Sequence, residues 1–154
     1  MRGIPQFFYG TEILMTSPRQ RNDGLVRADF PGGWAGDAVN AFSGQGLSPG
    51  QREAQQFLRR LLNWRKSATV THTGRLMHFV PEQGTYVYFR YDKRARVMVA
   101  FNKNRQPVTL ELSRFHEMLT PRSAGTDVLS GQRISLERTL TLPARSATIL
   151  EIDD

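Results

Sequence analysis

The stretch from Gly3 to Glu12, Gly-Ile-Pro-Gln-Phe-Phe-Tyr-Gly-Thr-Glu, constrains the fold most strongly. Its apolar run, Ile4 to Tyr9, is too short for a stable helix, rich in aromatic residues and followed by glycine. A short run that is apolar on both faces predicts a strand buried on both sides, which is typical of parallel sheets covered by helices. Glu12 would then follow the C-terminal end of that strand, where such folds carry functional groups.

The clearest helix comes after a glycine-rich segment, residues 13–48, that has the composition of a long loop. Ser48-Pro49-Gly50-Gln51 provides a serine N-cap, a proline at the first helical position and a glutamine three residues after the cap. The apolar residues that follow fall mostly on one face, with arginines on much of the other; they are Phe57, Leu58, Leu61, Leu62 and Trp64. This pattern predicts an amphipathic helix that ends near Lys66 and covers a sheet.

After the polar segment 67–74, the apolar pattern changes from a helical period to strict alternation. Turn signals at Pro81–Gly84, Asp92–Arg94, Asn102–Gln106 and Ser130–Gly131 separate short alternating runs. The predicted strands are Arg75–Val80, Thr85–Tyr91, Arg96–Asn102, Val108–Leu112, Thr126–Leu129, Ile134–Leu136, Thr139–Leu142 and Ala147–Ile152, with one helical turn at Phe115–Leu119. Several short strands at this spacing predict an antiparallel β-sandwich, so the chain should be mainly β.

Composition narrows the classes of function. The 154 residues carry a net charge of +7, but the only tight basic cluster, Lys93-Arg94-Ala95-Arg96, lies at an expected hairpin tip, so we expect no nucleic-acid partner. No apolar run approaches the length of a membrane span, and Met1-Arg2 is not followed by a signal peptide. There are no cysteines, and the three histidines lack zinc-site spacing, so we expect no metal and no cofactor.

The sequence resembles the C-terminal part of an α-amylase family enzyme, glycoside hydrolase family 13. The resemblance covers nearly the whole chain. It begins with the Gly3–Glu12 motif, which is similar to the eighth barrel strand of that family. It continues through Asp29-Phe30-Pro31-Gly32-Gly33-Trp34 and Asn40-Ala41-Phe42, which are most similar to the cyclomaltodextrinase and neopullulanase branch, then through Trp64-Arg65-Lys66 and the Tyr86–Tyr91 strand.

This resemblance implies an architecture. Residues 1–66 would be the last strand, long loop and last helix of a catalytic (β/α)8 barrel, and residues 67–154 a C-terminal β-sandwich domain. The family's three catalytic carboxylates lie on earlier barrel strands, so the chain is expected to carry no catalytic residue and to be inactive alone. The parent would be a bacterial starch- and maltodextrin-degrading glycosidase of the periplasm or cytoplasm, with α-glucan oligosaccharides and the remainder of the barrel as partners.

Four residues are candidates for substrate contact in the parent: Asp23, Arg27, Trp34 and Glu12. In the family an acid and an arginine at the spacing of Asp23 and Arg27 hydrogen-bond a sugar ring; alternatively Asp23 starts a turn and Arg27 pairs with Asp29. Trp34 would stack on a sugar or anchor its loop against the barrel. Glu12 would contact substrate or order its loop by accepting backbone N–H bonds.

Two further hypotheses concern surfaces. The sandwich aromatics Tyr86, Tyr88, Phe89 and Tyr91 would form a sugar-stacking platform or pack in the core, and alternation requires half of them to face inward. The chain would then be a stand-alone carbohydrate-binding or protein-interaction module.

Without its barrel neighbours, the segment 4–9 would have open edges, and would be disordered, folded back onto the sandwich or paired with another copy as a homo-oligomer.

Overall fold

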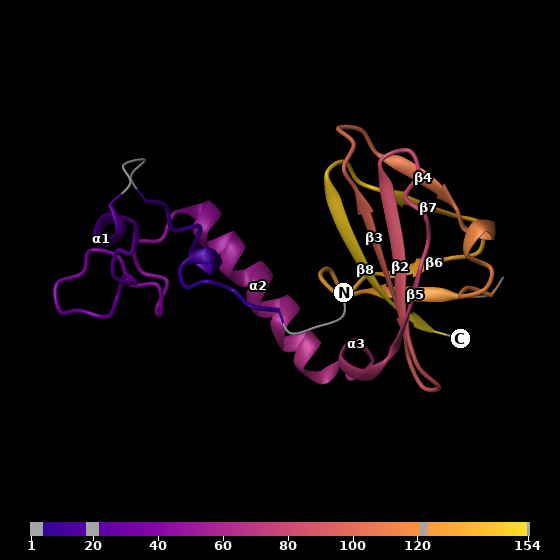
Figure 1. Cartoon of the computed structure of the whole chain (residues 1–154), viewed down its shortest axis with the longest axis horizontal. Helices are drawn as coiled ribbons and strands as arrows, with labels where there is room; N and C mark the ends of the chain where they lie inside the picture. The colour runs from indigo at the N-terminus through magenta and orange to yellow at the C-terminus, as the bar shows by residue number, and fades with distance from the viewer. Residues whose placement is uncertain (1–4, 18–21, 121–122, 154) are drawn as a thin grey trace. The chain divides into compact units, whose positions relative to one another are not determined.

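The computed structural model of the chain describes residues 5–17, 22–120 and 123–153. It contains two compact units, one ending at Leu62 and the other running from Asn63 to the C-terminus (Figure 1). The boundary falls inside the long helix α2 (Pro49–Ser67), so the last helical residues belong to the second unit. The two units are described separately below.

The first unit contains little regular structure before α2. It holds a 3-10 turn, η1 (Thr11–Ile13), and one helical turn, α1 (Asp23–Val26), within the segment that we predicted to be a loop. The predicted N-terminus of α2 is confirmed: the Ser48 N–H donates to Gln51 Oε1 at 2.9 Å, and the Gln51 N–H donates to Ser48 Oγ at 3.3 Å. These reciprocal bonds satisfy two donors that a helix start otherwise leaves unpaired.

The strand predicted over Ile4–Tyr9 is not formed. Residues 5–8 have no regular structure, Tyr9 and Gly10 form a turn, and Ile4 lies outside the described residues. A strand is stabilised by hydrogen bonds to neighbouring strands, and the described residues of this unit provide none. Phe7, Phe8 and Tyr9 instead line a hollow together with side chains of α2.

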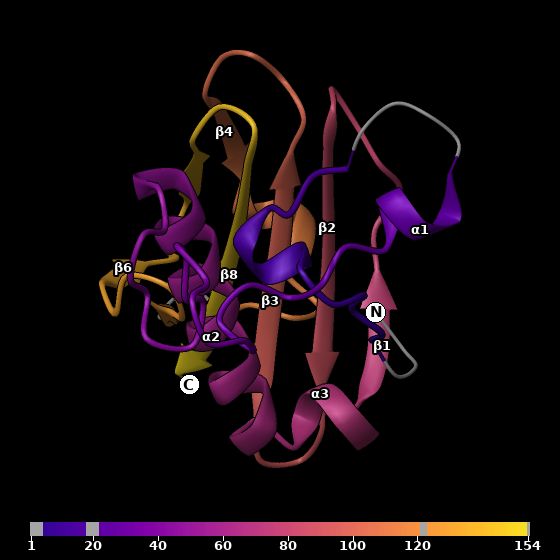
Figure 2. The same ribbon diagram turned by 90° about the vertical axis from the view of Figure 1, so that its left-hand side faces the viewer.

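The second unit is the predicted antiparallel sandwich. A six-stranded sheet has the order β1-β2-β3-β8-β5-β6, and a two-stranded sheet pairs β4 with β7 (Figures 1 and 2). The strands are β1 (Arg75–His78), β2 (Thr85–Tyr91), β3 (Arg96–Asn102), β4 (Val108–Glu111), β5 (Ala124–Asp127), β6 (Arg133–Ser135), β7 (Thr139–Leu142) and β8 (Ser146–Asp153). A 3-10 turn, η2 (Leu112–Phe115), comes before the predicted helical turn, and the Leu119 N–H donates to the Phe115 carbonyl oxygen at 2.9 Å, which closes one turn over Phe115–Leu119 as predicted.

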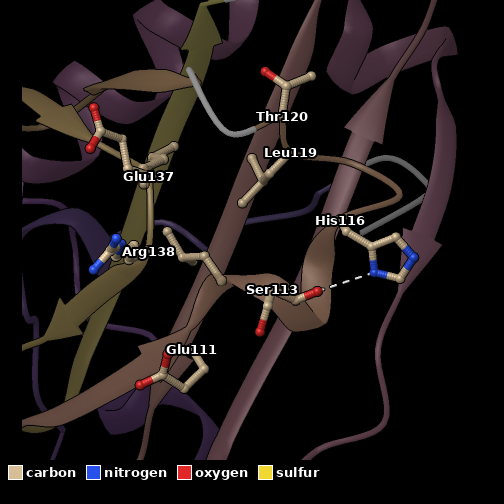
Figure 3. Close-up of a pocket in the computed structure, with 9 residues that line it drawn as sticks. Glu111, Ser113, His116, Leu119, Thr120, Glu137 and Arg138 are labelled. Carbon is tan, nitrogen blue, oxygen red and sulfur yellow. Dashed lines mark hydrogen bonds between the residues drawn. The ribbon is translucent and has the colours of Figure 1, made fainter.

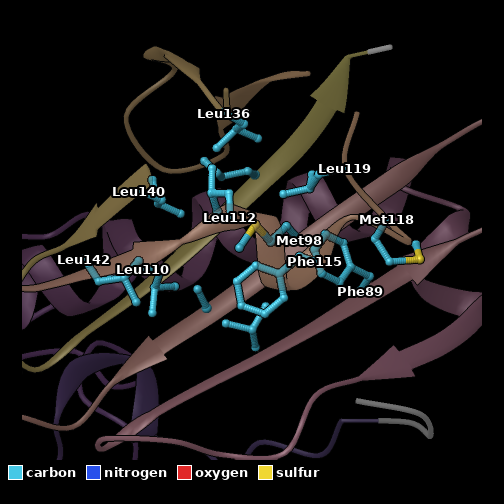
Figure 4. Close-up of a cluster of buried hydrophobic side chains, with 13 residues drawn as sticks. Phe89, Met98, Leu110, Leu112, Phe115, Met118, Leu119, Leu136, Leu140 and Leu142 are labelled. Atoms are coloured by element: carbon cyan, nitrogen blue, oxygen red, sulfur yellow. The ribbon is translucent and has the colours of Figure 1, made fainter. Parts of the chain in front are cut away.

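Apolar side chains from both sheets meet between them and form the main core (Figure 4). Phe89 on β2 and Met98 on β3 have no exposed surface, and Phe115 of η2 is 1% exposed. The Phe89 and Phe115 ring centroids lie 6.2 Å apart. Full burial of each such side chain contributes about 1.5–3 kcal/mol, so this cluster stabilises the unit.

A short helix, α3 (Val70–Thr73), connects α2 to β1, and its Val70 side chain is buried. The buried Arg90 guanidinium donates from Nη2 to the Gly74 carbonyl oxygen at 2.7 Å and to the His72 carbonyl oxygen at 3.4 Å. These bonds satisfy carbonyls that the end of a helix leaves unpaired. Trp64 Nε1 donates to Glu151 Oε1 of β8 at 2.7 Å, which fixes the last part of α2 on the sheet.

Candidate functional site

The four predicted substrate-contact residues all belong to the first unit. Glu12 lies in η1, is half-buried and lines a hollow of about 310 Å³. The other lining residues are Phe7, Phe8 and Tyr9 and, from α2, Gln55, Leu58, Arg59 and Leu62. The hollow therefore combines aromatic rings with one carboxylate and one guanidinium.

Asp23 and Arg27 lie one helical turn apart at α1. Arg27 Nη2 and Asp23 Oδ2 are 3.4 Å apart, and the two side chains are 67% and 86% exposed. Arg27 therefore pairs with Asp23. The alternative prediction paired it with Asp29. An exposed ion pair of this kind contributes little to stability, so both groups can exchange this contact for a ligand at small cost.

Trp34 lies on an ordered loop, and its side chain is exposed to solvent. Asp37 Oδ2 accepts the Gly32 N–H at 2.7 Å and the Trp34 N–H at 3.2 Å, and Gly32 has a φ of 103°, which glycine adopts without strain. The Ala41 N–H closes the base of the loop by donating to the Pro31 carbonyl oxygen at 3.0 Å. The Trp34 side chain is 68% exposed. Backbone order with an exposed indole is the arrangement that a stacking contact requires.

Of these four residues, the structure records a direct contact only between Asp23 and Arg27. Within the described ranges, no three histidine, cysteine, aspartate or glutamate side chains are grouped so that they could hold a metal ion. Among the same residues, no helix has the length and apolar content to cross a membrane. Whether the four residues contact a sugar stays a prediction.

The sandwich divides the predicted aromatic platform between two faces. Phe89 is in the core and Tyr91 packs against it, whereas Tyr86 and Tyr88 point to the opposite face of the sheet. Phe101 joins them there, since it pairs directly with Tyr86 across β2 and β3. The Tyr86 and Phe101 rings are nearly parallel, at 8°, with centroids 6.4 Å apart. Phe101 was not among the predicted platform residues, although alternation places it on the same face of its strand as Val97 and Val99.

This outer aromatic surface, defined here as His78, Tyr86, Tyr88 and Phe101, is partly accessible. Phe101 is 40% exposed, whereas Tyr88 is 8% exposed. Burial, and next the neighbouring Tyr86, raise the pKa of the Tyr88 hydroxyl above its ordinary value. The Tyr88 hydroxyl therefore stays protonated as a hydrogen-bond donor at neutral pH.

A second hollow, of about 370 Å³, lies in the sandwich (Figure 3). Its lining comes from the end of β4 and η2, from the segment that follows η2, and from the connection between β6 and β7. The lining residues are Glu111, Leu112, Ser113, His116, Leu119, Thr120, Leu136, Glu137 and Arg138. No local sequence pattern indicates this site, because it joins segments that are distant along the chain.

Comparison with known proteins identifies the sandwich. Residues 76–151 match the family described as the Cyclo-malto-dextrinase C-terminal domain. The sandwich is therefore similar to that family. The match begins at the second residue of β1 and ends within β8, so it covers nearly all of the sandwich.

Solved structures of α-amylase family enzymes share this fold. The α-amylase from Geobacillus thermoleovorans, solved with acarbose, matches 95% of this chain with a TM-score of 0.62 and 17% identity, over 29% of its own length. AmyP, solved with maltose, matches 70% of this chain with a TM-score of 0.59 and 18% identity, over 22% of its length. An Anoxybacillus α-amylase matches 70% with a TM-score of 0.53 and 16% identity, over 26% of its length. The chain therefore spans less than a third of each enzyme, and the predicted resemblance to the α-amylase family is confirmed.

Proposed function

We propose that the chain is the C-terminal region of an α-glucan hydrolase of the neopullulanase or cyclomaltodextrinase type. Residues 1–66 supply the last strand, long loop and last helix of a catalytic (β/α)8 barrel, and residues 67–154 supply a structural sandwich. The parent cleaves α-glucosidic bonds with retention, using a carboxylate pair that this chain does not carry. In this assignment the chain contributes substrate contacts and no catalytic group.

The observation that carries this proposal is the exposed apolar surface of the first unit. Its main buried cluster consists of Ile13, Ala41 and Leu47, and α2 has no buried residue. Nine large apolar side chains among its described residues are exposed: Phe7, Phe8, Tyr9, Leu14, Val26, Trp34, Phe42, Phe57 and Leu62. An amphipathic helix normally buries its apolar face, and monomeric proteins seldom leave apolar patches of this kind open. The remainder of a barrel is the partner that would cover both α2 and the segment 5–9.

The comparison with the Geobacillus enzyme supports the same partner. That match covers 95% of the chain, so it includes most of the first unit as well as the sandwich. Among the compared structures, AmyP was solved with maltose and with maltotriose, and the Geobacillus enzyme with acarbose. We therefore propose α-glucan oligosaccharides as the parent's ligands, with the Asp23 carboxylate and the Arg27 guanidinium bonding sugar hydroxyls, Trp34 stacking on a ring, and Glu12 facing the cleft.

A hybrid enzyme tests this proposal. The chain would replace the corresponding C-terminal region of a cyclomaltodextrinase, and hydrolysis of β-cyclodextrin and pullulan would be followed by reducing-sugar release. We expect the hybrid to be active, the isolated chain to be inactive, and a matched hybrid without residues 5–47 to be inactive. A folded but inactive hybrid, or sugar release by the purified chain itself at enzymatic rates, would contradict the assignment.

The alternative function is a stand-alone carbohydrate-binding or protein-interaction module, and the outer aromatic surface is the observation that favours it. Tyr86 and Phe101 present adjacent rings on one sheet face, and Phe101 is substantially exposed. Calorimetric titration with maltooligosaccharides distinguishes the two functions. A saturable signal that disappears in Phe101→Ala supports the module, whereas no signal supports a structural role for this face.

A further inference from the structure

The loop that carries Trp34, residues 31–45, is anchored at its base. The Ala41 N–H donates to the Pro31 carbonyl oxygen at 3.0 Å, which brings the two sides of the loop together. Ala41 is 1% exposed, and its carbonyl oxygen accepts a hydrogen bond from Gln55 Nε2 of α2 at 2.8 Å. The base of the loop is therefore joined both to itself and to the helix.

The tip of this loop, residues 32–37, packs directly on a neighbouring turn. Gly32 has a φ of 103°, and a Cβ at this position would lie only 2.7 Å from Asn40 Cγ, so the close approach requires glycine. Asn40 Oδ1 in turn accepts the N–H groups of Phe42 and Ser43, each at 3.0 Å. The tip therefore rests on a turn that is itself closed by hydrogen bonds.

The Asp37 carboxylate closes the tip around Trp34. One oxygen, Oδ2, accepts the Gly32 N–H at 2.7 Å and the Trp34 N–H at 3.2 Å, and the Asp37 N–H donates to the Trp34 carbonyl oxygen at 3.3 Å. Both backbone polar groups of Trp34 thus bond to the same residue. Hydrogen bonds to an ionised acceptor are about twice as strong as those between neutral groups, so the carboxylate is well suited to fix this backbone.

These hydrogen bonds order a residue whose side chain remains exposed. The Trp34 indole is 68% exposed, so ordering its backbone does not serve to bury the ring. An aromatic side chain on a backbone that is already ordered loses less conformational entropy when it contacts a ligand. We propose that Asp37 is a positioning residue, which acts through Trp34 by holding the indole where a ligand can stack on it. The identity of that ligand rests on the proposed function.

Amide hydrogen exchange of the full 154-residue chain tests the hydrogen bonds themselves. Asp37→Ala removes the accepting oxygen, so the amides of Gly32 and Trp34 should exchange about fivefold faster or more. Asp37→Asn keeps an accepting oxygen without the charge and should restore most of the protection. The control is Glu53→Gln, which removes a carboxylate charge from an exposed position of α2 and should have no effect. Unchanged exchange of both amides in Asp37→Ala would overturn the inference.

The hybrid enzyme described above separates positioning from a merely structural role. Asp37→Ala should raise the KM for β-cyclodextrin about tenfold and leave kcat within about twofold, because a stacking contact away from the reacting bond stabilises substrate and transition state equally. Asp37→Asn should recover most of this loss, and Glu53→Gln should match the unsubstituted hybrid. Trp34→Ala should raise the KM at least as much, and adding Asp37→Ala to it should change little, because Asp37 acts through the indole.

The outcomes distinguish this inference from the proposed function. An active hybrid in which Asp37→Ala leaves the KM unchanged, or in which the effects of Asp37→Ala and Trp34→Ala simply multiply, would overturn the positioning role alone. A loss of kcat with unchanged KM in folded Asp37→Ala, with folding verified by circular dichroism, would do the same. An inactive unsubstituted hybrid would overturn the proposed function and, with it, the role of Asp37 toward a ligand, whatever the exchange rates show.

Discussion

The sandwich and the first unit bury their apolar residues to different extents. Among the residues that the structure describes, the main sandwich cluster contains thirteen buried apolar residues, from Val87 to Leu150, whereas that of the first unit contains three. The sequence has comparable apolar content in the two regions, since the first unit carries aromatic residues from Phe7 to Phe57. The difference therefore lies in what covers those residues: the sandwich covers its own apolar side chains, whereas many of those in the first unit are exposed.

Amide hydrogen exchange provides the largest expected contrast between the two regions. The central residues of β3, such as Met98, are paired on both sides by β2 and β8 and should exchange only by global unfolding. The amides of residues 6–8 form no strand and should exchange at least about a thousandfold faster. Slow exchange of residues 6–8 in a monomer would mean that the segment has acquired strand partners within the chain itself.

Matched phenylalanine substitutions measure the same contrast in free energy. Phe89→Ala removes a ring with no exposed surface and should lower the free energy of unfolding by about 3–5 kcal/mol. Phe42→Ala removes a ring that is 72% exposed and should change it by less than about 0.5 kcal/mol. Urea unfolding followed by circular dichroism provides both values. Equal effects would show that the first unit has a core that also includes Phe42.

The sequence predicted the sandwich better than the first unit for a physical reason. The predicted bounds of Thr85–Tyr91 and Arg96–Asn102 are confirmed because long runs of β-branched and aromatic residues alternate there. Strand β5 begins two residues earlier than predicted, in a stretch with Gly125, whose missing side chain leaves no alternation to read. The Ile4–Tyr9 strand failed because strand formation depends on neighbouring strands, and a sequence pattern does not show whether those neighbours are present.

The candidate sites depended on information that local patterns lack. Asp23, Arg27, Trp34 and Glu12 could be selected because each lies in a recognisable motif, but a motif does not specify how the four side chains are arranged in space. The pairing of Tyr86 with Phe101 depends on strand register, which alternation alone does not determine. The sandwich hollow likewise depends on how two distant segments meet.

The reciprocal Ser48–Gln51 hydrogen bonds at the start of α2 allow helix stability to be tested in the first unit. Ser48→Ala removes the side-chain oxygen that accepts the Gln51 N–H and should destabilise the helix start by about 1 kcal/mol. The effect should appear as faster exchange of the amides of residues 51–54, with β3 unchanged. Ser43→Ala, on an exposed loop position of the same unit, is the control. Equal acceleration in both variants would mean that general loosening, and not capping, limits exchange at the helix start.

The smallest expected effect concerns the pH dependence of the sandwich. Asp92 Oδ1 accepts the N–H groups of Arg94 and Ala95, at 2.7 and 2.9 Å, in the turn between β2 and β3. These backbone hydrogen bonds hold the pKa of the Asp92 carboxyl below its ordinary value of 3.8. Because the folded carboxyl binds its proton more weakly than the unfolded one, the resulting stabilisation is present above that ordinary pKa and is lost as the pH falls through the lower, folded pKa.

Asp92→Asn should therefore make the acid side of the stability curve of the sandwich slightly shallower, measured by thermal unfolding between pH 2 and 6. The control, Asp37→Asn, removes a carboxylate that also accepts two backbone N–H groups, but it lies in the first unit and should leave the sandwich transition unchanged. If Asp37→Asn alters that transition as much as Asp92→Asn does, the two units unfold together. The contrast in burial would then reflect one cooperative structure with an open face, and not two regions of separate stability.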